Sequence, residues 1–271
     1  MRALKFSRKH LGIPYALFMA MFVIFPLLLI IYYAFTDPDT GKLSFINFID
    51  FFTSNANLTA LFISLALAIL TTVICLIISF PVAYILARTG MNKKGTMLLL
   101  FILPMWINFV LRTAAMKELL YTIGMFKSSK LSFVNTLIGM VYDYLPFTIL
   151  PIYTILEKLD KNVLEASSDL GATAMQTMFK VTIPLAMPGI VSAITMVFLP
   201  TMTSYVISDT LGNGNITIIG KLIESQFSVM FNWNLGSAMA MVLLVFIFAT
   251  MLITGKFSEE DNENTRGGGL W

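Results

Sequence analysis

Six long stretches of this chain are nearly free of charged side chains, and they limit what it can fold into. Four of them contain no Asp, Glu, Lys or Arg: 11–36, 51–87, 181–208 and 225–255. The range 95–111 is charge-free up to Arg112, and the range 131–156 is interrupted only by Asp143. A helix needs about 20 mostly apolar residues to cross the hydrocarbon core of a bilayer. Each stretch is therefore predicted to hold one membrane-spanning helix.

The composition agrees with a membrane protein and excludes several other classes. Hydrophobic residues make up 57% of the chain and charged residues 12%, about half the charged share of a soluble domain. Such a chain cannot cover a water-exposed surface with charge. A single cysteine, Cys75, and a single histidine, His10, exclude a disulfide framework and a zinc, haem or iron–sulfur cluster. The net charge of +3 is too small for a nucleic-acid interface, so no nucleic-acid partner is expected.

The predicted fold class is all-α, a polytopic membrane bundle of six transmembrane helices. The expected helices are 13–35, 58–87, 96–115, 132–156, 186–208 and 235–254. The runs are continuous and lack the alternation that a β-barrel requires. Some charge-free stretches are longer than one crossing, so their ends should include loop or interfacial helix. The helices form one predicted domain, 13–254, between a basic tail at 1–12 and a polar tail at 255–271. From Glu259 onward this tail is polar and Gly-rich and is predicted to be disordered.

The distribution of basic residues predicts the orientation. Twelve of the eighteen lysines and arginines lie in the two tails and in the connections near 88–94 and 157–185. Because cytoplasmic loops carry an excess of Lys and Arg, both termini and these two connections are predicted to be cytoplasmic. The connection after the third predicted span is counted with four basic residues, Arg112, Lys117, Lys127 and Lys130, which weaken the bias without reversing it. The first span is too long for a secretory signal and is interpreted as an uncleaved anchor.

The connection 157–185 is longer than the others and amphipathic. Apolar residues at helical spacing alternate with acidic and basic ones up to Gly171, a second helical stretch begins near Ala174, and Pro184 closes it. Two short helices joined at a glycine would form a rigid elbow that projects from the membrane. The same pattern also fits a segment that lies on the bilayer surface.

Residues of this connection resemble a family motif. Glu165-Ala166-Ser167-Ser168-Asp169-Leu170-Gly171-Ala172, followed by Val181-Thr182-Ile183-Pro184-Leu185, is similar to the EAA loop of ABC importer permeases. The family pattern is Glu-Ala-Ala, three residues, Gly, about nine more residues and Ile-x-Leu-Pro. Here Ser167 replaces the second Ala, and Pro184 and Leu185 stand in reversed order. Further segments, 104–112, 145–160, 184–190 and 199–209, resemble the permeases of polyamine (spermidine and putrescine) importers, and the likeness extends over about residues 60–250.

The resemblance implies a transporter subunit of a bacterial inner membrane and not an enzyme. Such permeases work in pairs around a translocation path, so the implied partners are a related second permease, two cytoplasmic ATPase subunits and an extracytoplasmic substrate-binding protein. ATP and Mg would be bound by the ATPase subunits, and this chain would hold no cofactor. The EAA helix docks on the ATPase. The residues implied for coupling are Glu165, Ala166, Asp169, Gly171, Ala172, Ile183 and Pro184.

Asp143 is the one acidic residue inside a predicted span. A carboxylate at membrane depth is costly and generally faces a cavity or a partner, and aromatic faces attract cations. The predicted substrate path therefore includes Trp106, Tyr142, Asp143, Tyr205 and Asp209. A carboxylate that is hydrogen-bonded within the bundle is the alternative for Asp143.

The sequence leaves three alternatives to a polyamine permease. The first is an importer permease for another small solute. The second is an ion-coupled carrier or channel, which would need more intramembrane charges or an inverted repeat. The third is a membrane enzyme, for which the sequence offers no nucleophile–base constellation. A phosphate loop is also missing, because the nearest approach, Gly214 to Lys221, has the wrong spacing.

Overall fold

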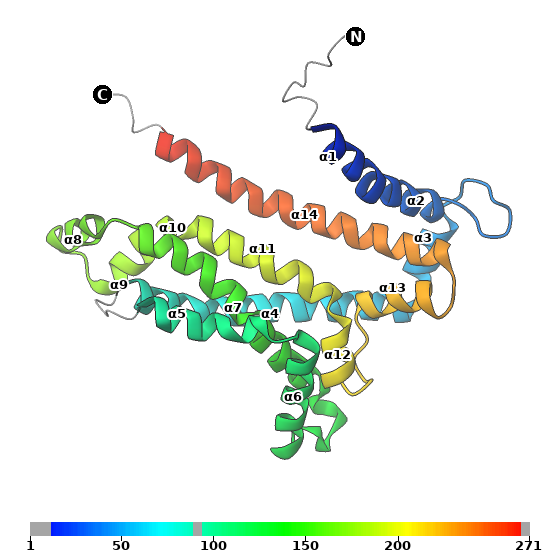
Figure 1. The fold of residues 1–271 in the computed structure, drawn as a ribbon, viewed down its shortest axis with the longest axis horizontal. Helices are drawn as coiled ribbons and strands as arrows, with labels where there is room; N and C mark the ends of the chain where they lie inside the picture. The colour runs from blue at the N-terminus through cyan, green and yellow to red at the C-terminus, as the bar shows by residue number, and fades with distance from the viewer. Residues whose placement is uncertain (1–11, 89–93, 267–271) are drawn as a thin grey trace, which may run out of the picture. The chain divides into compact units, whose positions relative to one another are not determined.

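The secondary structure is helical in the part of the chain that the computed structural model describes, residues 12–88 and 94–266 (Figure 1). In those residues the sole β-type pairing is an isolated bridge between Thr36 and Leu43. The predicted all-α class is confirmed. Contacts divide the chain into two compact units, Met1–Leu58 with Leu222–Phe246 and Thr59–Lys221 with Ile247–Trp271. The predicted basic tail at 1–12 lies almost wholly outside the described residues.

Within residues 12–88 and 94–266, four helical segments are long and apolar enough to cross a membrane. They are Pro14–Ala34, Asn55–Arg88, Ser129–Lys158 and Trp233–Leu252. Two further pairs of helices pass the same criteria together but are sharply bent, so the number of spans is up to six if each bent pair is one span. Every backbone N–H and C=O in a bilayer must find a partner inside the protein, and a helix achieves this within one segment.

The first span belongs to the first unit and consists of α1 (Gly12–Met19), η2 (Ala20–Ile24) and α2 (Phe25–Ala34). The central element η2 is one turn of π-helix that ends in a hydrogen bond from the Phe25 N–H to the Ala20 carbonyl. Pro26 follows directly. Because a proline ring clashes with the carbonyl four residues earlier, a local widening of the helix is expected at this point.

Two asparagines hold the end of the first span. The short helix α3 (Ile46–Thr53) places Asn47 where its Nδ2 donates to the Ala34 and Thr36 carbonyls, at 3.0 and 2.9 Å. Asn234, near the start of α14 (Trp233–Arg266), donates to the Tyr33 and Thr36 carbonyls at 3.1 and 2.6 Å. The bonds to Ala34 and Thr36 satisfy carbonyl groups at the end of the helix, whereas the Tyr33 carbonyl also accepts from the Thr36 N–H at 3.3 Å.

The second unit contains most of the remaining helices. Two long ones confirm the expected spans, α4 (Asn55–Arg88) and α7 (Ser132–Lys158), and both continue through internal prolines. The others are α5 (Lys94–Ile102), η3 (Leu103–Trp106), α6 (Phe109–Thr122), η4 (Met125–Lys127), η5 (Ser129–Leu131), α8 (Lys161–Asp169), α9 (Ala174–Thr177), η6 (Met178–Thr182), α10 (Ile183–Leu185), α11 (Met187–Thr203) and α12 (Tyr205–Leu211). α13 (Ile219–Ser228) crosses the boundary between the units.

Two predicted helices, 96–115 and 186–208, are not continuous. The first breaks at Ile107 and Asn108, where the backbone is extended, and the segments on either side are bent by 95°. The second is bent by 65° at its start, between Ala174–Leu185 and Met187–Thr203, and it breaks again at Ser204. Prolines stand in the segments beside the bends and cannot donate the hydrogen bonds that a straight helix needs.

The last helix is longer than predicted. α14 runs to Arg266, whereas the expected helix ended at residue 254 and the tail from Glu259 onward was expected to be disordered. The expected end of the helix is wrong, and the expected disorder is wrong for residues 259–266. Residues 267–271 lie outside the described part of the chain. The segment 255–266 contains three Glu, one Lys and one Arg, which are good helix formers and continue an existing helix at little cost.

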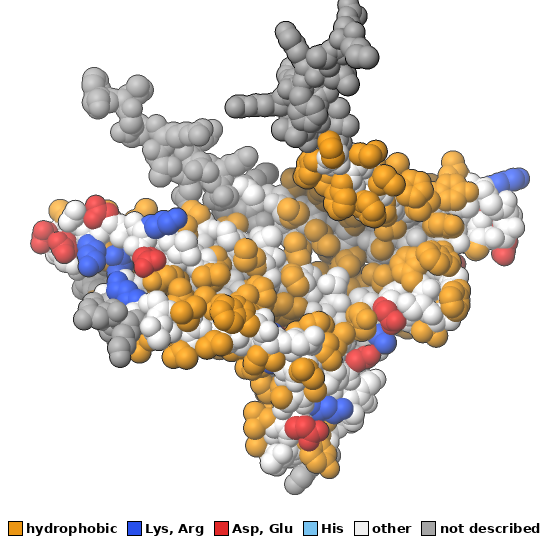
Figure 2. Space-filling model, viewed as in Figure 1, with side chains coloured by type: hydrophobic (Ala, Val, Ile, Leu, Met, Phe, Trp, Pro, Cys, Tyr) orange, Lys and Arg blue, Asp and Glu red, His pale blue; other side chains and the backbone are white. Residues whose placement is uncertain are grey.

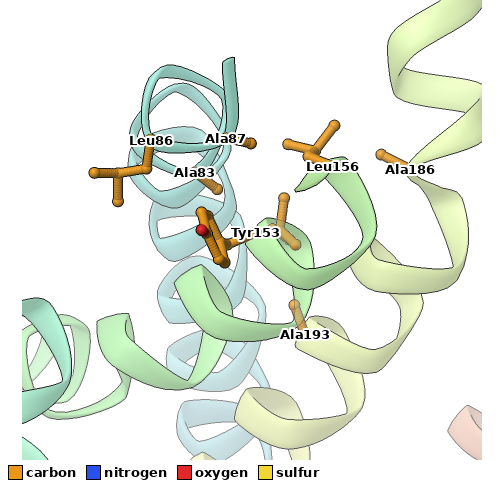
Figure 3. Close-up of a cluster of buried hydrophobic side chains, with 8 residues drawn as sticks. Ala83, Leu86, Ala87, Tyr153, Leu156, Ala186 and Ala193 are labelled. Carbon is orange, nitrogen blue, oxygen red and sulfur yellow. The ribbon is translucent and has the colours of Figure 1, made fainter. Parts of the chain in front are cut away.

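The second unit has one apolar core at each end. One is formed by Ala83, Leu86 and Ala87 of α4, Ile152, Tyr153 and Leu156 of α7, and Ala186 and Ala193 near and within α11 (Figure 3). The other includes Leu67, Leu120, Met140, Ile207, Leu211 and Ile218. The C-terminal ends of α4 and α7 and the start of α11 therefore lie together. α8 and α9 lie at this end of α7 and α11, and α6 and α12 lie together at the other end (Figure 1).

Charge is concentrated where the helices end. On the face drawn in Figure 2, hydrophobic side chains cover much of the surface of the helices, while acidic and basic side chains gather over α8 and α9. This is the distribution expected of helices that lie in lipid and of a connection that lies in water.

Candidate functional site

The predicted elbow is present, and its first arm is α8. Asp160 begins this helix as an N-cap, because its side chain accepts a hydrogen bond from the Asn162 N–H at 3.0 Å. Such a cap supplies an acceptor to an N–H that has no partner in the helix. Glu165, Ala166 and Asp169 are all exposed on this arm.

Gly171 makes the turn between the two arms. Its φ is +80°, a left-handed conformation that favours glycine. The Gly171 N–H donates to the Ser168 carbonyl at 2.9 Å, and the Ala172 N–H donates to the Ser167 carbonyl at 3.1 Å. This pair of bonds is a Schellman motif, which satisfies the last carbonyls of α8 and reverses the chain.

The second arm begins with a complete capping box. The Thr173 hydroxyl accepts from the Gln176 N–H at 3.3 Å, and the Gln176 side chain accepts from the Thr173 N–H at 2.9 Å. One turn of π-helix, η6, follows before Pro184, as η2 precedes Pro26 in the first span. Both ends of the elbow are therefore fixed by local hydrogen bonds.

A buried hydrogen bond joins the two arms. The hydroxyl groups of Ser167 and Thr177 lie 2.9 Å apart, and both residues are buried. Ser167 is the residue that departs from the Glu-Ala-Ala pattern. In this chain the departure therefore has a structural role, because the added hydroxyl ties the first arm to the second.

The predicted coupling residues divide between two surfaces. Ala166, Gly171 and Ala172 line a pocket of about 690 Å³ on the elbow, and Leu170 beside them is 89% exposed. Ile183 instead lines an apolar groove of about 700 Å³ with residues of α4, and Pro184 next to it is exposed. The elbow thus presents a surface of small residues with an exposed leucine beside them.

The elbow is attached directly to the spans. Arg88, the last residue of α4, donates from Nη1 to the carbonyl of Leu159, which ends α7, at 3.2 Å. Leu156 of α7 and Ala186 just before α11 pack in the same core as the end of α4 (Figure 3). The residues at both ends of the elbow are therefore in close contact with the ends of α4 and α7 and with the start of α11.

The second candidate site lies at the break in the third span. Asn108 begins α6 as an N-cap and accepts from the Val110 N–H at 2.9 Å. The redirected helix carries Arg112 and Thr113 towards α7, and both are buried. The cap at Asn108 exists only because the predicted helix 96–115 is interrupted here and a new helix begins.

Asp143 of α7 is held by these two residues. Its carboxylate forms an ion pair with Nε of Arg112 and accepts a hydrogen bond from the Thr113 hydroxyl at 3.1 Å. The side chains of Arg112 and Asp143 are 7% and 4% exposed. The carboxylate is thus hydrogen-bonded within the bundle, which was the alternative considered for it, and its charge is balanced by a neighbour. Removing one partner of such a buried pair is strongly destabilising.

The ion pair nevertheless faces a cavity. A pocket of about 440 Å³ is lined by Trp106, Asn108, Arg112, Asp143, Tyr144 and Ser204, among others. Trp106 is 76% exposed, and Tyr144 forms a hydrogen bond with Ser204 across the pocket wall. Tyr142 lies on the other side of Arg112, whose guanidinium carbon is 5.6 Å from the centre of the tyrosine ring.

The structure does not bring Tyr205 and Asp209 to this pocket. Both contact Lys221: the ammonium lies 3.0 Å from the Asp209 carboxylate and 5.3 Å from the centre of the Tyr205 ring. The five residues predicted for a substrate path therefore fall into two groups, one around Asp143 and one around Lys221. Their role in transport stays a prediction.

Arg112 is the residue that the sequence reasoning assigned wrongly. It was counted with the external connection, although it falls inside the predicted span 96–115. An arginine within a span needs a partner, and Asp143 is the carboxylate within another span. The presence of one arginine and one aspartate inside two predicted spans was therefore a signal in the sequence that the two residues pair. No comparable signal pointed to Thr113 or Ser204, since hydroxyl residues are common throughout the helices.

Comparison with known proteins supplies the family. Residues 79–258 match the family described as binding-protein-dependent transport system inner membrane component. The chain belongs to this family. It is an importer permease of the ABC type, and its place is the inner membrane, in agreement with the predicted class.

Relatives of known function resemble the permease over most of its length. It is 34% identical over 272 residues to the spermidine/putrescine transport system permease protein PotB of Haemophilus influenzae, covering 90% of this chain and 93% of the relative. It is 35% identical over 218 residues to PotB of Escherichia coli, covering 73% and 79%.

A solved structure shows the same fold. The crystal structure of a bacterial ABC transporter involved in the import of the acidic polysaccharide alginate superposes with a TM-score of 0.72 at 14% identity, over 93% of this chain and 94% of that one. A second alginate transporter structure, in complex with a pentasaccharide-bound periplasmic protein, gives a TM-score of 0.73 at 13% identity, over 93% of each chain.

Proposed function

We propose that this permease lines the translocation path of an ATP-driven importer of polyamines such as spermidine and putrescine. The observation that carries the proposal is the similarity to PotB permeases, at 34% identity over 90% of the chain. Polyamines are flexible cations, and a path for them needs carboxylates or aromatic faces to offset the loss of water.

The working complex would contain a second permease, two ATPase subunits that bind ATP and Mg, and an extracytoplasmic binding protein that delivers the polyamine. The second permease is proposed to be a PotC-like relative of this chain. Both termini of this chain and the elbow would face the cytoplasm, where the ATPases lie. The hydrolytic chemistry would belong to those subunits, and this chain would bind no cofactor.

The elbow is proposed as the ATPase dock. Three features support this: α8 is exposed, the turn at Gly171 is locally fixed, and the arms are attached to α4, α7 and α11. Glu165, Ala166, Asp169, Gly171 and Ala172 would contact or shape the docking surface. Closure of the ATPase dimer on ATP would then tilt the spans, since a ligand that favours one of two states shifts the population toward it.

The pocket around Asp143 is proposed as part of the substrate path, with Trp106 and Tyr142 as neighbouring aromatic groups. Tyr205 and Asp209 would act further along or at the mouth, in the group that contacts Lys221. The cluster around Asp143 is the stronger candidate, because it combines a carboxylate, an exposed tryptophan and a cavity.

The proposal is tested by reconstitution of the whole complex in liposomes that enclose ATP. Uptake of radiolabelled spermidine should depend on the binding protein and on hydrolysable ATP, and unlabelled putrescine should compete with it. A non-hydrolysable ATP analogue is the control and should abolish uptake. If the complex instead transports a sugar or an anion and ignores spermidine, the polyamine assignment falls and the family assignment stands.

A further inference from the structure

We propose that Arg112 is a replaceable counter-ion that sets the affinity of the path for cations. While the path is empty, its guanidinium neutralises Asp143. When a polyamine passes, an ammonium group of the substrate takes the place of the guanidinium at the carboxylate. Arg112 is in this sense a specificity-determining residue. The inference rests on the proposed polyamine function.

The carboxylate belongs to a residue that lines the cavity, and its Oδ1 is buried in the ion pair. Arg112 and Asp143 both line the 440 Å³ pocket that also contains the exposed side chain of Trp106. Oδ1 is paired with Arg112, and Oδ2 accepts from the Thr113 hydroxyl, so Oδ2 has a second lone pair for another donor. An incoming ammonium thus has an acceptor before the guanidinium leaves.

Arg112 has other partners that remain when it releases the carboxylate. Its Nη1 donates to the Pro104 carbonyl at 2.8 Å, and its Nη2 lies 3.5 Å from the backbone carbonyl of Asp143. Its guanidinium also faces the ring of Tyr142 at 5.6 Å. A guanidinium has five N–H donors in a planar fork, so it can lose the carboxylate and stay hydrogen-bonded and stacked. This lowers the cost of the exchange.

A neutral pair suits a transporter better than a bare carboxylate. An unpaired buried charge would bind a polyamine strongly, and the substrate would then leave slowly. With the Arg112–Asp143 pair intact, the site has no net charge. It then binds a cation only if the contact between the substrate ammonium and the carboxylate is more favourable than the contact with the guanidinium. The guanidinium that remains beside the substrate repels it and favours its release.

The proposal predicts shifts of opposite sign for two variants of one pair. Arg112→Gln leaves Asp143 unpaired, so spermidine should bind about tenfold more tightly and maximal uptake should fall as release slows. Asp143→Asn leaves Arg112 unpaired, so spermidine should bind about tenfold more weakly. If the pair had a purely structural role, both variants would bind spermidine more weakly.

The measurement uses the complete permease–ATPase complex in nanodiscs. Equilibrium dialysis with radiolabelled spermidine gives the affinity, and uptake into liposomes gives the maximal rate. The matched control is Lys117→Gln, which removes one positive charge from α6, the helix that carries Arg112, outside the pocket, and should leave the affinity unchanged. Arg112→Lys keeps the charge that folding requires but holds the carboxylate through a single ammonium. It should therefore tighten binding by about two- to threefold.

The double variant Arg112→Gln with Asp143→Asn contains no unpaired buried charge and so avoids the main folding risk. It should lose the tighter binding of Arg112→Gln, because the carboxylate responsible is gone. Shifts of the same sign in the two single variants, or tight binding that survives in the double variant, would overturn the exchange. Wild-type complex that takes up no spermidine would overturn the polyamine function, and the exchange with it.

Discussion

The elbow offers a test in which one backbone angle is changed in steps. Gly171 has a φ of +80°, and a Cβ built on it meets no atom within 4 Å. Substitution there therefore adds backbone strain without a steric clash. The series Gly171→Asn, Gly171→Ala and Gly171→Pro raises that strain progressively, since Asn tolerates the left-handed region best and Pro cannot enter it.

The size of each effect follows from the conformation. An L-residue such as Ala pays about 1–2 kcal/mol in the left-handed region, which corresponds to about a fivefold to thirtyfold change in an equilibrium constant. Asn should cost less than Ala. Proline fixes φ near −65° and also removes the N–H that donates to the Ser168 carbonyl at 2.9 Å. The loss should then reach about 3 kcal/mol or more, and docking should weaken by about a hundredfold or more.

The assay is titration of the purified permease with its ATPase subunit, together with ATP-dependent uptake. The matched control is Gly214, which also has a left-handed φ, +73°, and no atom within 4 Å of a built Cβ. Gly214→Ala should cost similar stability and leave ATPase affinity unchanged. If Gly171→Ala and Gly171→Pro weakened ATPase binding equally, the absence of a side chain at residue 171 would be what matters, and not its backbone angle. Full docking by Gly171→Pro would refute the elbow as the dock.

Three further predictions concern stability and are measured by thermal unfolding of the complex in detergent. Ser167→Ala should destabilise the elbow by about 1 kcal/mol, and adding Thr177→Val should recover part of that loss, because the lone hydroxyl is then gone. Gly189→Ala should lower the melting temperature clearly, since its Cβ would stand 2.9 Å from the Pro151 carbonyl oxygen where α7 and α11 meet. Asn47→Ala should cost about 1–3 kcal/mol, because two carbonyls at the end of the first span lose a donor.

The sequence predicts the spans well where hydropathy alone decides whether a segment is helical. Long apolar runs without charge become helices because a bilayer leaves the backbone no other partner, and this holds for α4 and α7 despite their internal prolines. The helix predicted over 96–115 is not continuous, and hydropathy does not register such a break. The break depends on Pro104 and on the N-cap at Asn108. An asparagine can cap a helix only where its own backbone is non-helical, so the residue type alone does not predict the break.

The two candidate sites differ in how far they could be predicted. The elbow depends on neighbours in the sequence: a cap at Asp160, a glycine at 171 and a capping box at Thr173. Such signals are local, and the predicted arms are present. The Arg112–Asp143 pair joins residues 31 positions apart. It forms only because the broken third span turns Arg112 towards α7, so a prediction that kept the span straight could not place it.

Both sites depend on one helix, and this decides how their variants must be compared. α7 carries Asp143 in the pocket and Leu156 in the core beneath the elbow, thirteen residues apart, or about 20 Å along the helix. A change at either place can therefore reduce uptake through α7.

ATPase affinity separates an effect at the elbow from an effect at the pocket, because it depends on the shape of the elbow and not on the charge in the pocket. A variant at Gly171 should lose ATPase affinity and keep spermidine affinity, whereas a variant at Arg112 should change spermidine affinity and keep the ATPase. If one variant of each kind changed both affinities equally, α7 would be transmitting structural damage, and neither site could be assigned its own role.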